Sequence, residues 1–181
     1  LENLSRTLAG PLGVSARQIR RAWLSGLEAQ TGFDDSCREA GAEILAEARE
    51  RGEKLLVLVG RPYNSFDEGL NLGLPTKMAE YGRTILPLEF LGADLGLLGP
   101  RYANVFWSYG QKILATIERV VAHEDLDAVY LTNFSCGPDS FLLSYAEEIA
   151  GNHPFLALEL DEHGADTGYL TRIEAFFDVL G

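Results

Sequence analysis

Cys136 is the residue of this sequence best placed to do chemistry, because a cysteine thiolate can bind a metal or attack an electrophile. It follows the apolar run of residues 128–132, which is typical of a buried strand, and it comes directly before Gly137 and Pro138. A helical pattern begins there, and Pro138 suits a first helical position. Backbone N–H groups and the positive end of a helix favour a thiolate. The sequence therefore predicts an activated cysteine in a strand-to-helix turn.

Polar and aromatic side chains also follow the other apolar runs that read as strands. Ligands bind beyond the carboxyl ends of the strands in a parallel α/β sheet, so these side chains are expected to meet at one edge. They are Arg61, Tyr63, Asn64, Glu89, Asn133, Asp161, Glu162 and His163.

Several of these residues have two interpretations. Arg61 either pairs with one of the many carboxylates or holds a phosphate or carboxylate ligand by a bidentate contact. Tyr63 and Asn64 either line a pocket or only shape the turn. His163 is expected to cap the following helix, with a general base or a metal ligand as alternatives. Thiol-dependent hydrolysis by Cys136 and His163 also stays open at this stage.

The elements that must position these residues alternate along the chain from residue 53 onward. Four short apolar runs predict strands, and helical periodicity separates them. The runs are residues 54–59, 83–88, 127–132 and 155–160. This alternation predicts an α/β fold, a Rossmann-like (flavodoxin-like) parallel sheet of about four strands with helices on both faces.

We expect residues 1–52 to form a helical segment that packs on the Rossmann-like domain of residues 53–181. The first ten residues have no clear period and predict a linker. Ser15 and Gln18 form a capping-box pattern at the start of one helix. Asp34 and Asp35 are expected to open a second helix, in which Cys37 lies on the apolar stripe as a core residue. The chain begins without Met, and we expect it to be a piece of a longer protein.

Composition excludes several classes of protein. The net charge of −12 argues against a nucleic-acid binder, which needs a basic face. No apolar run reaches the length of a membrane span, and no signal peptide is visible. Two cysteines far apart in the sequence favour a reducing compartment, so we expect a cytoplasmic protein. The P-loop, dinucleotide-binding and serine-hydrolase motifs are missing from the sequence.

Four blocks of the sequence, taken together and in order, resemble a known family. They are Val59–Asn64, Leu70–Pro75, Tyr130–Phe141 and Leu158–His163, and the run Asn-Phe-Ser-Cys-Gly-Pro-Asp at 133–139 is the most specific. The set resembles a domain of the large CoA-substrate-specific enzyme activases, which are related to the 2-hydroxyacyl-CoA dehydratase family. The resemblance extends over most of the chain from about residue 35.

The resemblance implies a [4Fe–4S] cluster that receives low-potential electrons from an ATP-hydrolysing activator. Cys136 would be one cluster ligand, and Arg61, Tyr63, Asn64 and Asn133 would line the cluster or an acyl-CoA pocket. Four cysteines usually hold such a cluster, so other domains of the parent protein would supply the remaining ligands, and the isolated chain is expected to be inactive. The alternative is a non-catalytic module that binds a ligand or docks a partner, with Cys136 buried and inert.

Overall fold

The structure is a computed structural model that describes residues 1–134 and 136–181. Its centre is a parallel sheet with the strand order β2-β1-β3-β4. The strands are β1 (Leu55–Gly60), β2 (Thr84–Pro87), β3 (Leu126–Asn133) and β4 (Phe155–Leu160). The predicted Rossmann-like α/β class and the four strands are thus confirmed.

Helices connect the strands and continue after the last one. Between β1 and β2 lie α3 (Pro62–Phe66), α4 (Glu68–Asn71) and α5 (Leu74–Glu80). Between β2 and β3 lie α6 (Leu88–Leu91), the short 3₁₀ turns η1 (Leu95–Leu97) and η2 (Pro100–Tyr102), and α7 (Ser108–Val121). The remaining two are α8 (Gly137–Ala150), which precedes β4, and α9 (Thr167–Leu180), which follows it.

Two apolar layers lie on opposite faces of the sheet, and β1 contributes to both. Leu55 and Val57 pack in a layer with side chains of α6, α7, α8 and the long N-terminal helix α2 (Ala16–Arg51). Leu56 and Leu58 pack on the other face, in a layer with α5 and α9. Because both faces are covered, every residue of β1 is buried, which is why the strand reads as a continuous apolar run.

The N-terminal region differs from the prediction in two ways. Residues Glu2–Leu12 form the helix α1 rather than a linker, and a single helix, α2 (Ala16–Arg51), takes the place of two. The capping box of Ser15 and Gln18 is confirmed at the start of α2. Asp34 does not begin a new helix but lies inside α2, where its side chain accepts a hydrogen bond from Gln30 one turn earlier (2.9 Å). Acidic residues favour helix starts, but α2 continues through Gly32 and this acidic pair without a break.

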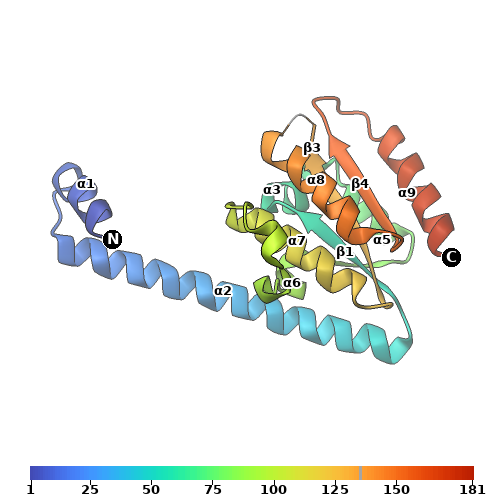
Figure 1. Ribbon diagram of the computed structural model, residues 1–181, viewed down its shortest axis with the longest axis horizontal. Coiled ribbons are helices and arrows are strands. Elements are labelled where there is room, and N and C mark those ends of the chain that lie inside the picture. The colour runs from blue at the N-terminus through green and yellow to red at the C-terminus, as the bar shows by residue number, and fades with distance from the viewer. Residues whose placement is uncertain (135) are drawn as a thin grey trace.

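Only the C-terminal half of α2 packs against the sheet layers. Its buried residues there are Cys37, Gly41, Leu45 and Ala48. The N-terminal half extends away from the rest of the molecule, with α1 folded back beside it (Figure 1). In the part of the chain that the structure describes, each helix is either too short or too polar to cross a membrane.

The connections place a topological switch point between β1 and β3. The chain leaves β1 toward β2 on one side of it and returns to β3 on the other side. The loops that follow β1 and β3 therefore leave the sheet in different directions at the carboxyl ends of these two strands. Open α/β sheets bind ligands at such a point. The segments that follow these two strands contain Arg61, Asn64 and Cys136.

Candidate functional site

An ion pair lies at the switch point and joins its two sides. Arg61, directly after β1, donates to Asp139 Oδ1 from both Nε (3.1 Å) and Nη2 (2.6 Å). Asp139 lies in the first turn of α8, and its Oδ2 accepts a hydrogen bond from the Thr132 hydroxyl (2.9 Å). The Asp139 side chain is only 2% exposed and that of Arg61 16%. The hydrogen bond to Asp139 raises the pKa of Arg61 above its usual value. The first interpretation of Arg61, pairing with a carboxylate, is confirmed.

Cys136 is the residue that immediately precedes α8, as the sequence predicted. Its backbone N–H donates to the Asn133 carbonyl (3.1 Å), and its own carbonyl accepts from the Ser140 amide (3.0 Å) and hydroxyl (2.9 Å). The side chain is partly buried rather than enclosed, and the Arg61 charge lies within electrostatic range. The neighbouring Ser135 lies outside the described residues.

Asn64 holds the turn after β1 against the neighbouring strand. It is fully buried, and its Nδ2 donates to the Leu131 carbonyl of β3 (3.2 Å). Asn71 in turn donates to the Asn64 carbonyl (2.9 Å). Tyr63, one residue earlier, is exposed. Asn64 thus shapes the turn, while the Tyr63 ring faces solvent.

Four buried polar atoms near this edge have no hydrogen-bond partner among the described residues. They are Asn64 Oδ1, Ser65 Oγ, Asn133 Oδ1 and the Tyr130 hydroxyl. Burial raises the pKa of Tyr130, whose ring is close enough to Asp139, Arg61 and Cys136 for their charges to contribute. Buried polar groups in folded proteins are nearly always paired. These atoms therefore have hydrogen-bonding capacity that the described residues do not use.

Several segments at the same edge carry exposed aromatic rings. These segments begin or end at the carboxyl side of the sheet, namely α3, the approach to α7, the end of β3 and the start of α8 (Figure 1). The rings are those of Tyr63, Phe66, Phe106, Trp107, Phe134 and Phe141. Clustered exposed apolar side chains mark interaction surfaces more often than isolated ones do. We call these six residues the aromatic rim.

The exit of β2 forms a second polar contact. The Tyr109 hydroxyl, on α7, donates to Glu89 Oε1 (2.8 Å), and burial raises the pKa of Tyr109. Cys37 is buried beside the same carboxylate, and burial, followed by the charges of Glu89 and Asp34, raises the pKa of its thiol. Cys37 is confirmed as a core residue.

The exit of β4 contradicts the predicted role of His163. The following helix, α9, begins after Asp166, so His163 does not cap it. Its Nδ1 lies 3.0 Å from Asp161 Oδ2, and its backbone N–H donates to Asp161 Oδ1 (2.9 Å). These contacts hold the pKa of Asp161 below its usual value. Within the described residues no hydrogen bond joins His163 to Cys136, so the geometry gives no support to a Cys–His pair.

The residues present do not fit a complete iron–sulfur site. Such clusters usually take four thiolates, and this sequence contains two cysteines with different surroundings. Among the described residues no three His, Cys, Asp or Glu side chains gather in a way that could hold a metal ion. Only Cys136 is both partly accessible and at the sheet edge. The described part of the chain therefore offers at most one ligand of a cluster.

Sequence reasoning gave Asp139, Thr132 and Tyr130 no individual role at this edge. An acidic residue in a first helical turn is already explained by its interaction with the helix dipole. The sequence therefore gives no separate sign that Asp139 pairs with Arg61. Thr132 and Tyr130 lie inside an apolar strand pattern. The alternation of side chains along β3, which places residues 130 and 132 on one face, is the signal that relates them.

Comparison with protein families finds one match. The model of the family described as CoA enzyme activase uncharacterised domain (DUF2229) matches residues 1–91, half of the 181-residue chain. The motif around Cys136 lies beyond the matched residues. No curated protein and no solved structure matches the chain.

Proposed function

We propose, from the premise that this chain belongs to the CoA enzyme activase uncharacterised domain family, that it contributes one cysteine ligand and pocket residues to an iron–sulfur site. The parent would be a protein of the 2-hydroxyacyl-CoA dehydratase/activase group. The observation that carries the proposal is the position of Cys136, partly accessible at the switch point of a parallel sheet and next to the Arg61–Asp139 pair.

In this proposal the chain's own residues prepare one side of the site. Asp139 fixes the Arg61 guanidinium by two hydrogen bonds, so the positive charge stays close to Cys136 without side-chain reorganisation. Asn64 and Asn133, which follow β1 and end β3, each keep a buried amide oxygen without a hydrogen-bond partner in the described part of the chain. A [4Fe–4S] cluster, when bound, would supply low-potential electron transfer driven by ATP hydrolysis in an activator.

The remaining ligands must come from outside the described residues, and the aromatic rim supports a second polypeptide surface there. Six exposed rings at one edge of the sheet cost solvation free energy, which burial against another domain would relieve. A pocket closed in this way between two domains is also the usual setting for a small-molecule site. An acyl-CoA or another anionic small molecule is the ligand that we expect between them.

The test is anaerobic iron–sulfur reconstitution of the longest natural polypeptide that contains this chain. The Cys136→Ala variant is compared with native protein, and Cys37→Ala serves as the matched control because Cys37 is buried in the core. We expect Cys136→Ala to lower iron content and to change the visible and EPR spectra, while Cys37→Ala leaves both unchanged. Equal iron content and identical spectra in native and Cys136→Ala protein would overturn the proposal.

A second candidate is a docking or ligand-binding module with an inert cysteine. The specific observation in its favour is that Arg61 is already paired with Asp139 while the aromatic rim is exposed. This function requires Cys136 to stay unreactive in the folded chain. An unchanged reconstitution result together with slow thiol labelling of Cys136 supports this candidate, and rapid labelling argues against it.

A further inference from the structure

A groove of about 440 Å³ lies between α2, α6 and α7, on the part of the molecule where the long helix meets the sheet layers. Its apolar surface comes from small and aliphatic side chains and from one aromatic ring. These are Gly41, Ala42, Leu45, Ala46, Phe90 and Leu91. The volume is within the range of small-molecule sites.

The floor of this groove depends on a very close helix contact. A β-carbon placed on Gly41 would lie 2.0 Å from the Phe90 carbonyl oxygen, so only glycine allows α2 to approach α6 this closely. Ala42 and Ala46 continue the small side chains along the same helix. The backbone of α6 therefore forms one wall of the groove directly.

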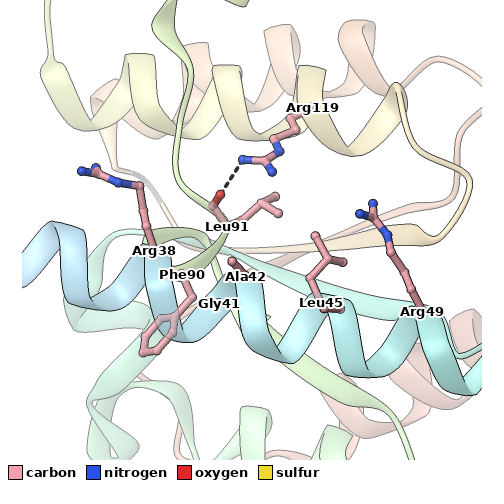
Figure 2. A pocket seen from close by; sticks show the side chains of 9 residues that line it. Arg38, Gly41, Ala42, Leu45, Arg49, Phe90, Leu91 and Arg119 are labelled. Carbon is pink, nitrogen blue, oxygen red and sulfur yellow. Dashed lines mark hydrogen bonds between the residues drawn. The ribbon is translucent and has the colours of Figure 1, made fainter.

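All charged side chains that line the groove are arginines, Arg38, Arg49 and Arg119, and no described carboxylate lines it. This is unexpected in a chain whose net charge is −12. Figure 2 shows Arg38 and Arg49 rising from α2 on the side that faces α7, and Arg119 reaching from α7 to the Leu91 carbonyl between them. The groove is thus a local positive site on an acidic protein, which attracts anions.

The arginines keep hydrogen-bonding capacity for a ligand. Arg119 Nη1 donates to the carbonyls of Leu91 (2.5 Å) and Gly92 (3.2 Å), which fixes the guanidinium at the groove. Its Nε and Nη2 have no protein partner in the described ranges. Arg38 pairs with Asp35 and Arg49 with Asp125, but these side chains are substantially exposed. Exposed pairs of this kind are weak and exchange readily.

The stem of Arg38 and the guanidinium of Arg119 both lie beside Gly92. A β-carbon placed on Gly92 would lie 3.0 Å from Arg38 Cδ and 4.0 Å from Arg119 Nη1. Arg49 is eleven residues from Arg38, which is roughly 16 Å along an α-helix. If the exposed pair with Asp35 opens, the Arg38 head group can turn about this stem, and one anionic group can then contact Arg38 and Arg119. The rest of the ligand would extend over Ala42 and Leu45 toward Arg49.

We propose that this groove binds a small organic anion, with a phosphate or carboxylate group held by Arg38 and Arg119 and an apolar body over Ala42 and Leu45. Guanidinium groups match both anions by bidentate hydrogen bonds. The groove contains neither Cys136 nor any of the residues in the proposed iron–sulfur site. The proposed anion site is therefore independent of the proposed iron–sulfur function.

Isothermal titration of the chain tests the proposal with four probes. Phenyl phosphate carries a phosphate on an apolar ring, and benzoate carries a carboxylate on one. Inorganic phosphate provides an anionic group without a ring, and phenol provides the ring without an anionic group. We expect phenyl phosphate or benzoate to bind more tightly than inorganic phosphate or phenol, and increasing salt to weaken binding. The stronger of the two identifies the anionic group. Failure of both to bind at millimolar concentration, or equal binding of phenol, overturns the proposal.

Substitutions then locate the site. Arg38→Gln and Arg119→Gln should each weaken binding at least about fivefold, because each loses a charge-assisted hydrogen bond. Arg119→Lys keeps the positive charge but not the bidentate geometry of the guanidinium, so it should bind with intermediate affinity. This variant also shows whether a loss of binding in Arg119→Gln reflects a folding defect. The matched control is Arg101→Gln, since Arg101 is exposed and pairs with Glu148 outside the groove. Equal weakening in Arg101→Gln would overturn the assignment.

Discussion

Arg61 Nη2 lies 2.6 Å from Asp139 Oδ1, and this ion pair joins the end of β1 to the first turn of α8, 78 residues later in the sequence. The pair thus connects the segments that follow β1 and β3 at the switch point. The pair is almost enclosed, with the carboxylate further held by Thr132. The position of Cys136, at the start of α8, is therefore coupled to the loop after β1.

Replacing Asp139 by Asn should destabilise the chain strongly. The substitution leaves the Arg61 guanidinium partly buried and without its counter-charge, which costs about 2–4 kcal/mol of unfolding free energy. Urea denaturation of native and variant protein measures the change. The control is Glu148→Gln, which breaks the exposed pair with Arg101 and should cost less than about 1 kcal/mol. Similar losses in both variants would show that the Arg61 pair has no special structural role.

Thiol labelling should distinguish the two cysteines of the folded chain. Cys37 is buried and the pKa of its thiol is raised, so the reactive thiolate is rare and inaccessible. Cys136 is partly exposed at a helix start, and we expect it to react quickly with an aromatic disulfide reagent at neutral pH. One fast thiol should be counted per chain, and none in Cys136→Ser. A fast phase that persists in Cys136→Ser would place the reactivity at Cys37.

Asp127 should make stability depend on pH in the opposite sense to most carboxylates. Burial raises its folded-state pKa above the ordinary 3.8, although Lys54, His153 and Arg83 partly oppose the shift. The neutral form is therefore favoured on folding: its contribution is complete below about pH 3.8 and is lost as pH rises through the folded pKa. Asp127→Asn should unfold at higher urea than native protein at pH 7.

The same comparison at lower pH contains its own control. As pH falls below 3.8, Asp127 becomes protonated in both states, so the advantage of Asp127→Asn should shrink toward zero. A stability difference that stays constant from pH 7 to pH 3.5 would mean that the ionised carboxylate is not the cause. Asp125 differs, since its contact with Arg49 lowers its pKa.

The sheet was predictable because each strand carries its own signal. Residues 55–60 are covered on both faces, and the continuous apolar run records that burial. The position of Cys136 was predictable for the same reason, since a strand, a Gly-Pro pair and a helix follow one another locally. What remained hidden depends on contacts between distant segments. No local pattern relates Arg61 to Asp139, or Arg119 to the end of α6.

The two errors at the N-terminus have a related physical origin. The acidic pair at 34 and 35 resembles a helix start, but helix propensity on both sides is sufficient for α2 to continue through it. The helix α1 carries Leu4, Leu8 and Leu12 at helical spacing, but it is short and contains Gly10 and Pro11, so it depends on the surface that α2 provides for these leucines. Helices of this length rarely persist alone in water.

Gly41 should tolerate no side chain, whereas other glycines of the same helix should gain from one. In Gly41→Ala the new β-carbon would overlap the Phe90 carbonyl oxygen, which is backbone and cannot rotate away. The helices must separate, at a cost of about 1–3 kcal/mol. Gly32→Ala is the matched control, since Gly32 also lies inside α2 and has nothing within 4 Å of the new carbon.

Because alanine is the better helix former, Gly32→Ala should raise the unfolding free energy by up to about 1 kcal/mol. Urea denaturation followed by far-ultraviolet circular dichroism measures both variants. The two substitutions make the same chemical change in one helix, so their opposite signs isolate the contact with α6 from helix propensity. If Gly41→Ala proved as stable as Gly32→Ala, the close approach of α2 to α6, and with it the wall of the arginine-lined groove, would be wrong.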